Sequence, residues 1–237
     1  MTKRTFIGDV HGKYDRYGKI LKTCTNSIQV GDMGIGFFRE NAMDGELIPY
    51  ANPPYDRMVE GNHRFIRGNH DNPGVCKKHS QWIPDGTIED GVMFIGGGLS
   101  IDRAMRVEGR SWWADEELNY GELNDLAGKY LQEKPRVVVT HDCPETVANH
   151  LFRTQKLWDP SRTRQAFDGM WENHKPELWI FGHWHDHRNM EILGTRFICL
   201  AELQTAEVDL ETLEVTVPPR ESKVSKEDLD LLLKAMI

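Results

Sequence analysis

Short apolar segments that end in polar groups are the feature of this sequence that most restricts its fold. Five such segments lead into the groups Asp9-Val10-His11, Gly31-Asp32, Gly68-Asn69-His70-Asp71, Thr140-His141 and Gly182-His183-Trp184-His185. A glycine at the junction permits the sharp turn with which a strand ends. Because α/β sheets bind ligands beyond the carboxyl ends of their strands, we expect the five groups to meet at one place.

The segments around these groups predict alternating strands and helices. We expect strands at 3–7, 27–30, 63–66, 92–95, 137–139, 178–181 and 197–200, and a hairpin of 206–210 with 213–217. Helical spacing of apolar residues predicts helices near 12–24, 115–134 and 162–174, and an amphipathic helix that begins at Ser225. This alternation indicates an α/β fold. We expect one domain over 1–217, with 218–237 as a linker and a helix packed on it.

The composition argues against several classes of function. The 237-residue chain has a formal charge of -8, which disfavours binding to long nucleic acid or to an anionic membrane surface. It contains no apolar run of the roughly 20 residues that a membrane helix needs, and its first residues lack a secretory signal pattern. Its four cysteines form no CxxC pair and are typical of reduced thiols. We therefore expect a cytoplasmic protein with no membrane partner.

The five groups contain a set of side chains suited to binding metal ions. Two carboxylates, four imidazoles and one carboxamide are present without any thiolate: Asp9, Asp32, His11, His141, His183, His185 and Asn69. Such mixed oxygen and nitrogen sets favour an open catalytic site over a closed structural zinc. Seven ligands suit two ions that share a carboxylate, an arrangement that promotes in-line displacement at phosphorus. We expect two divalent ions, most favourably Mn²⁺, with Fe, Zn²⁺ or Ni²⁺ as alternatives.

The same groups resemble the motifs of the calcineurin-like metallophosphoesterase superfamily. Its pattern of DxH, GD, GNH[DE], a lone His and GHxH occurs here in order between Asp9 and His185, as in small bacterial and phage-type members. The resemblance implies a four-layer α/β/β/α sandwich of two mixed sheets flanked by helices. It also implies hydrolysis of a phosphate ester through attack by a metal-bridging hydroxide.

The resemblance implies a role for each metal ligand. One ion would be bound by Asp9, His11 and His185. The second ion would be bound by Asn69, His141 and His183, and Asp32 would bridge the two.

Three neighbouring residues are catalytic candidates with two possible roles each. His70 would be the general acid that protonates the leaving oxygen, or would position the phosphoryl group. Asp71 would orient His70 or cap the following turn. Arg67 would bind a phosphate through its forked guanidinium or form a structural ion pair.

The expected substrate is a small phosphorylated molecule, either a nucleotide or a phosphodiester. GDVHG and RGNH also occur in serine/threonine protein phosphatases, but Ile35 and Gly36 stand where that branch has Asp and Arg. Protein phosphatase is therefore the alternative, and a DNA or RNA nuclease is less favoured because the chain is acidic.

Two segments are expected to determine specificity. The connection 33–62 is long and rich in aromatic residues, which suit stacking on a nucleobase or packing as a surface loop. The segment 96–113 offers Arg103, Arg106 and Arg110 either to a phosphate or to ion pairs on the surface. The C-terminal helix is a candidate contact for a homo-oligomer.

Overall fold

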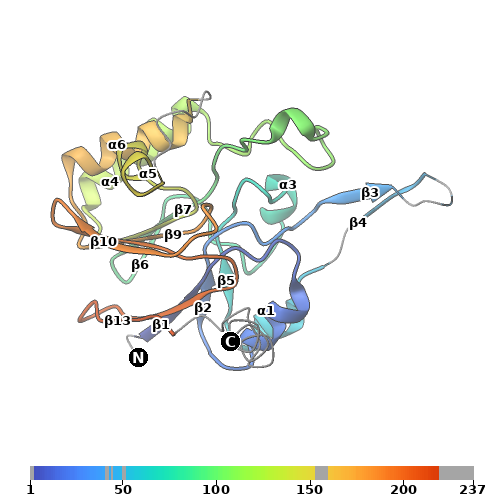
Figure 1. Cartoon of the computed structure of the whole chain (residues 1–237), viewed down its shortest axis with the longest axis horizontal. Helices are drawn as coiled ribbons and strands as arrows, with labels where there is room; N and C mark the ends of the chain where they lie inside the picture. The colour runs from blue at the N-terminus through green and yellow to red at the C-terminus, as the bar shows by residue number, and fades with distance from the viewer. Residues whose placement is uncertain (1–2, 41–42, 44, 50–51, 153–159, 219–237) are drawn as a thin grey trace, which may run out of the picture.

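The computed structural model describes residues 3–40, 43, 45–49, 52–152 and 160–218. The helix expected from Ser225 lies outside the described residues and stays a prediction. Two β-sheets form the centre of the fold, with helices on their outer sides (Figure 1).

The first sheet has the strand order β13-β12-β1-β2-β5. Its strands are β1 (Lys3–Ile7), β2 (Ser27–Gln29), β5 (Arg64–Phe65), β12 (Thr205–Asp209) and β13 (Val215–Thr216). β1 is parallel to β2, and β2 is parallel to β5, whereas β12 and β13 are antiparallel to their neighbours. The sheet is therefore mixed, and the carboxyl ends of β1, β2 and β5 lie at the same edge.

The second sheet has the strand order β10-β11-β9-β8-β7-β6. Its strands are β6 (Thr87–Glu89), β7 (Val92–Ile95), β8 (Val137–Thr140), β9 (Leu178–Phe181), β10 (Arg188–Ile192) and β11 (Thr195–Cys199). The four central strands are parallel, and β6 and β10 pair antiparallel at the two edges. Strands β7 and β9 are apolar throughout, as expected for strands of a sheet that is covered on both faces.

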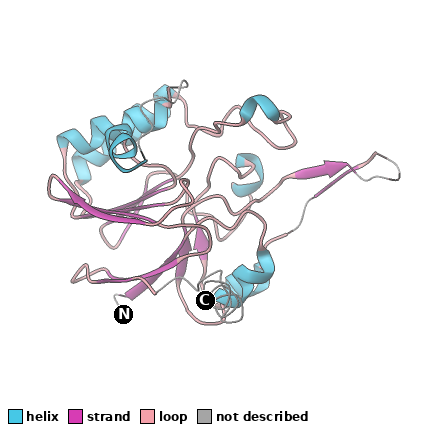
Figure 2. Ribbon diagram, in the orientation of Figure 1, coloured by secondary structure: helices cyan, strands magenta, loops and turns pink. Residues whose placement is uncertain are grey.

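Three clusters of buried apolar side chains hold the sheets and helices together. Figure 2 shows the helices on the outer sides of the two sheets. Residues of both sheets, such as Phe6 and Phe94, share one cluster between the sheets. Helices α4 (Tyr120–Glu133), α5 (Glu145–Phe152) and α6 (Arg162–Asn173) cover the outer face of the second sheet, and α1 (Tyr14–Ile20) and α2 (Tyr55–Glu60) cover that of the first. The predicted four-layer sandwich of two mixed sheets is confirmed.

Several elements differ from the sequence prediction. The helix expected at 115–134 begins only at Tyr120, because Asn119 and Glu122 form a reciprocal capping box that fixes its start. The helix expected at 12–24 covers only Tyr14–Ile20. Helices α2, α3 (Pro73–Cys76) and α5 and strands β6 and β10 were not predicted.

The connection 33–62 is not one continuous loop. It contains helix α2 and a hairpin of β3 (Phe38–Glu40) and β4 (Leu47–Pro49), which projects away from the sandwich (Figure 1). The segment 96–113 contains a short 3₁₀ turn, η1 (Arg103–Met105), and also lies outside the sheets. No helix among the described residues is both long and apolar enough to cross a membrane.

Candidate metal centre

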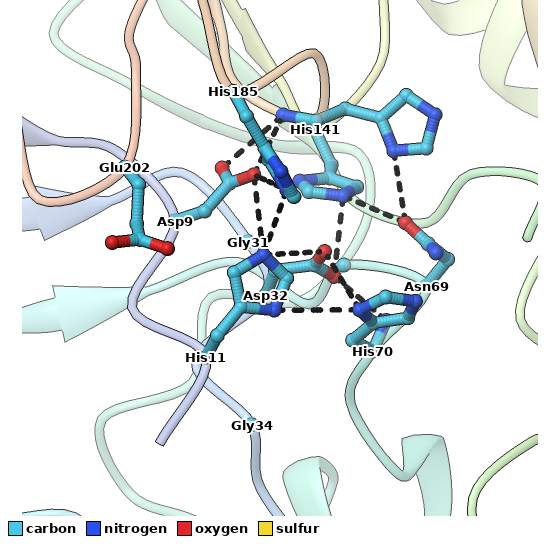
Figure 3. Close-up of polar contacts among 12 residues, drawn as sticks. Asp9, His11, Gly31, Asp32, Gly34, Asn69, His70, His141, His185 and Glu202 are labelled. Atoms are coloured by element: carbon cyan, nitrogen blue, oxygen red, sulfur yellow. Dashed lines mark hydrogen bonds and ion pairs between the residues drawn. The ribbon is translucent and has the colours of Figure 1, made fainter. Parts of the chain in front are cut away.

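The two sheets bring the seven predicted metal ligands together. The ligands follow directly after β1, β2, β5, β8 and β9, and their side chains point toward one another (Figure 3). We call these residues the donor cluster: Asp9, His11, Asp32, Asn69, His141, His183 and His185. Their donor atoms form two groups of metal-binding size, and both groups contain Asp32.

The first group consists of Asp9, His11, Asp32 and His185. The Nε2 atoms of His11 and His185 are 2.8 Å apart, and the Oδ2 atom of Asp9 is 3.2 Å from Nε2 of His185. Nε2 of His11 lies 3.7 Å from the nearest carboxylate oxygens of Asp9 and Asp32. Ligands at about 2.1 Å from one ion are separated by roughly 3.0–3.4 Å, so this spacing fits a shared cation.

The second group consists of Asp32, His141 and His183, with Asn69 beside them. Oδ1 of Asn69 is 2.9 Å from Nε2 of His141 and 2.9 Å from Nδ1 of His183. Nε2 of His141 is also 3.2 Å from Oδ1 of Asp32. Asp32 thus presents its two carboxylate oxygens to different groups of nitrogen donors, as a bridging ligand would.

Second contacts orient the donors of this group. His141 donates its Nδ1 proton to the carbonyl oxygen of Val30 at 2.9 Å, so its Nε2 lone pair faces the cluster. Asn69 donates through Nδ2 to Oγ of Ser100 at 2.9 Å, and Ser100 donates to Glu116 at 2.5 Å. These bonds aim the amide oxygen of Asn69 at the two histidines. No sequence signal identified Ser100 or Glu116, because both contacts depend on the path of a loop.

Backbone strain is concentrated in the donor cluster. His11, Asp32, His183 and His185 have φ values of 48°, 59°, 67° and 52°, which non-glycine residues adopt rarely. The glycine before Asn69 is needed for close approach, because a Cβ on Gly68 would lie 2.1 Å from Oδ1 of Asp32. The strand-Gly-polar pattern of the sequence therefore reflects tight packing of the donors.

The buried negative charge of the donor cluster favours the binding of a cation. Asp9 and Asp32 are fully buried. Although burial opposes ionisation, hydrogen bonds from His11 and His185 lower the pKa of Asp9 to about 2. Burial also lowers the pKa of His141, but Asp32 and Asp9 outweigh it and raise the pKa to about 10. The buried imidazole gains a proton because the negative charge of the two carboxylates is not otherwise balanced. Divalent cations bound at this site would balance that charge and replace the proton.

His70 lies next to the donor cluster and within reach of it. Its backbone N–H donates to Oδ1 of Asp32 at 2.6 Å, and its Nδ1 is 3.3 Å from Nδ1 of His11. Burial and the charge of Arg106 lower the pKa of His70 to about 4, against the opposing effect of Asp32. Burial therefore opposes the charged form of His70, and its ring lies against the donor cluster.

Asp71 and Arg67 are both held by buried structural contacts, and the cap of the following helix is Asn72 instead of Asp71. The buried carboxylate of Asp71 accepts hydrogen bonds from the backbone N–H groups of residues 33, 34, 35 and 68, so it joins two loops beneath the cluster. Arg67 is 2% exposed and donates to Asp85 at 3.0 Å and to the carbonyl oxygens of Asp115 and Glu116. Its guanidinium is engaged in the structural ion pair, and the structure does not place it at a phosphate site.

A pocket of about 260 Å³ opens beside the donor cluster. It is lined by His11, Gly12, Tyr14, Gly34, Phe37, His70 and Arg106. Phe37 contacts Trp113 with ring centroids 5.1 Å apart, and Arg106 bonds to Asp102. We call Phe37, Asp102, Arg106 and Trp113 the pocket wall. Asp102 was not among the sequence candidates, and Arg106 was one of three.

The chain belongs to the calcineurin-like phosphoesterase family, whose model matches residues 2–187. This match confirms the family predicted from the sequence. The members are metal-dependent hydrolases of phosphoric esters, and the enzyme class predicted for this chain is the same.

Solved structures are similar to this chain at low sequence identity. A putative 5'-nucleotidase from Staphylococcus aureus matches with a TM-score of 0.50 and 12% identity over 99% of this chain, which spans 58% of that protein. An archaeal phosphodiesterase matches with a TM-score of 0.43 and 12% identity, over 91% of this chain and 98% of that protein. A phosphopantetheinyl hydrolase from Mycobacterium tuberculosis matches with a TM-score of 0.42 and 12% identity, over 94% of this chain and 99% of that protein. No curated protein matches the chain.

Proposed function

We propose that this protein is a dinuclear metal-dependent phosphoesterase that hydrolyses a phosphate ester of a small molecule. The observation that carries the proposal is the pair of donor groups that share Asp32. Two divalent cations held there would supply charge neutralisation at the phosphoryl group and a nucleophile from water at neutral pH.

The ligands divide between the two cations according to their distances. Asp9, His11 and His185 would hold one cation, and Asn69, His141 and His183 would hold the other. Asp32 would contribute one oxygen to each. The absence of sulfur donors in this set favours Mn²⁺ first, with Fe, Zn²⁺ or Ni²⁺ as alternatives.

His70 acts on the ester from the edge of the pocket. Its bond to Asp32 fixes the backbone, so the imidazole stays beside the donor cluster. In that place it would protonate the leaving oxygen or hold the phosphoryl group through a hydrogen bond. Asp71 supports this geometry indirectly by joining the loops that carry Asp32 and His70.

The substrate would be a nucleotide or a small phosphodiester. The pocket has the volume for a small ligand, and Phe37 and Tyr14 offer aromatic surface beside the donors. Two divalent cations would outweigh the two buried carboxylates, so the site attracts an anionic ester although the chain is acidic overall. The four free cysteines support a cytoplasmic location.

A substrate panel with defined metals tests the proposal. The protein is stripped with a chelator and reloaded with Mn²⁺, Zn²⁺, Mg²⁺ or Ni²⁺, and bound metal is counted by elemental analysis. Aryl phosphomonoesters and phosphodiesters are assayed beside mononucleotides, cyclic nucleotides, dinucleoside polyphosphates and phosphopeptides. We expect two metals per chain and turnover of at least one small ester.

The panel also separates the alternatives. Faster turnover of phosphopeptides than of nucleotides at equal concentration would favour a protein phosphatase. No turnover of either aryl ester with any of the four metals would refute the phosphoesterase proposal.

A further inference from the structure

Arg106 brings a cationic side chain to the pocket from a segment outside both sheets. It follows the η1 turn, and its side chain lines the pocket together with His11 and His70. The side chain is 19% exposed, so it is largely enclosed while one side faces the pocket. The motifs that build the donor cluster do not include it.

The guanidinium of Arg106 is held in one orientation. Nε and Nη2 donate to the two carboxylate oxygens of Asp102, each at 2.6 Å, and Nη1 donates to the carbonyl oxygen of Ser111 at 3.2 Å. These bonds, among the described residues, engage three of its five N–H donors and leave donors for a ligand. A bidentate ion pair with a carboxylate fixes the plane of the guanidinium as well as the position of its charge.

Phe37 supports the same side chain from the other segment of the pocket wall. The centre of the Arg106 guanidinium lies 5.9 Å from the ring centroid of Phe37. Phe37 packs against Trp113, and the backbone N–H of Phe38 donates to the carbonyl oxygen of Arg110 at 3.1 Å. The segment of η1 and the base of the β3–β4 hairpin are thus joined, and the Phe37 ring centroid lies 6.1 Å from that of His70.

Asp102 also faces His70 across the pocket edge. Its Oδ1 atom, which accepts from Arg106, is 3.9 Å from Nε2 of His70. The carboxylate therefore sets the place of Arg106 relative to the residue that acts on the ester. Because Asp102 balances the charge of Arg106, the pair contributes directed hydrogen bonds more than net charge.

We propose that Arg106 is a substrate-binding residue that donates hydrogen bonds to a non-bridging oxygen of the substrate phosphoryl group, with Asp102 as its positioning residue. This inference rests on the proposed phosphoesterase function. A planar guanidinium with free donors matches phosphoryl oxygens in geometry, and Arg106 lines the same pocket as His11 and His70.

Steady-state kinetics and phosphate inhibition test the inference in the metal-loaded protein. The variants are Arg106→Gln, Arg106→Lys and Asp102→Asn, and Arg16→Gln is the control, an exposed arginine of α1 that does not line the pocket. The readouts are KM and kcat for an aryl phosphate and the inhibition constant of inorganic phosphate. Metal content and the melting temperature report whether the site and the fold are intact.

We expect Arg106→Gln to raise KM and the phosphate inhibition constant together by about 10- to 100-fold, the effect of losing charge-assisted hydrogen bonds. Arg106→Lys should recover part of the lost substrate and phosphate binding, because lysine restores the positive charge but not the paired donors of the planar guanidinium. Asp102→Asn should raise both constants less than Arg106→Gln does. Arg16→Gln should match the wild type, and all variants should keep two metals.

Two results would overturn the inference while leaving the proposed function intact. In the first, Arg106→Gln and Arg106→Lys keep KM and the phosphate inhibition constant within twofold of the wild type. In the second, Arg106→Gln lowers kcat alone or loses metal, and Asp102→Asn and Arg106→Lys leave both constants unchanged. An inactive wild type with every metal would instead count against the phosphoesterase function itself.

Discussion

The donor cluster and the pocket wall lie side by side, but the chain holds them in different ways. Asp9, Asp32 and His141 follow strands of the packed sheets and are at most 1% exposed. The wall is built from loops, and its neighbours Ile101 and Met105 are 68% and 84% exposed. Groups that must meet a metal ion within fractions of an ångström are placed on the rigid part of the fold. Groups that face the substrate are placed where the backbone tolerates change.

This difference leads to unequal consequences of mutation. We expect a change in the donor cluster to alter the number of bound metals and the reaction with every substrate. We expect a change in the pocket wall to alter substrate binding and to leave the metals in place. The predictions that follow test this division, and each is paired with a control residue outside the two regions.

The largest effect is expected for Asp32→Asn. The carboxamide has the same size, but it removes the negative charge that both donor groups share. We expect kcat to fall by roughly 10³-fold or more and at least one metal to be lost, because metal stabilisation contributes several kcal/mol to the transition state. Elemental analysis and kcat are the measurements. Asp15→Asn, an exposed change in α1, should keep both at the wild-type level. A fully active Asp32→Asn protein would rule out the bridging role.

A smaller but distinct effect is expected for Gly68→Ala. The added Cβ would lie 2.1 Å from Oδ1 of Asp32, so Asp32 or its loop must move. We expect overpacking to lower the free energy of unfolding by about 1–3 kcal/mol, and displacement of the ligand to reduce kcat by about 10²-fold. Urea denaturation and kinetics with added Mn²⁺ measure the two effects.

Gly128→Ala is the control for this substitution. Gly128 lies in α4, and a Cβ there meets no atom within 4 Å. The change should raise the free energy of unfolding by about 0.5–1 kcal/mol, because alanine loses less entropy than glycine in a helix. Equal stability and activity of Gly68→Ala and Gly128→Ala would contradict the close-packing account of the strand ends.

The α/β class and the donor cluster were predictable because their signals are local, whereas the four-layer sandwich was expected from the family resemblance. A short apolar run, a glycine and a polar residue are adjacent in sequence, and the carboxyl ends of parallel strands then gather these residues at one edge. Strands such as Lys3–Ile7 and Val92–Ile95 have the predicted bounds for the same reason. The ligand roles remain predictions that the metal analysis tests.

The pocket wall and the role of Arg67 depend on contacts between distant residues. Arg67 precedes Gly68 as closely as Asn69 follows it, yet its side chain is drawn to Asp85, 18 residues later. Asp102 gives no pattern in the sequence, because its importance comes from its contact with Arg106 in a turn outside the sheets. The short strands of the β3–β4 hairpin give only a weak periodic signal.

The smallest effect is expected for Phe37→Ala in the pocket wall. The change removes the ring that packs on Trp113 and lies beside Arg106 and His70, but it leaves every donor of the cluster in place. We expect kcat/KM to fall by about 2- to 10-fold, the range that lost aromatic contacts produce. Two metals per chain and an unchanged metal affinity should accompany this loss. Met105→Ala, at an 84% exposed site of the η1 turn, should change neither quantity. Loss of metal in Phe37→Ala would show that the wall supports the donor cluster, and the division between the two regions would then be wrong.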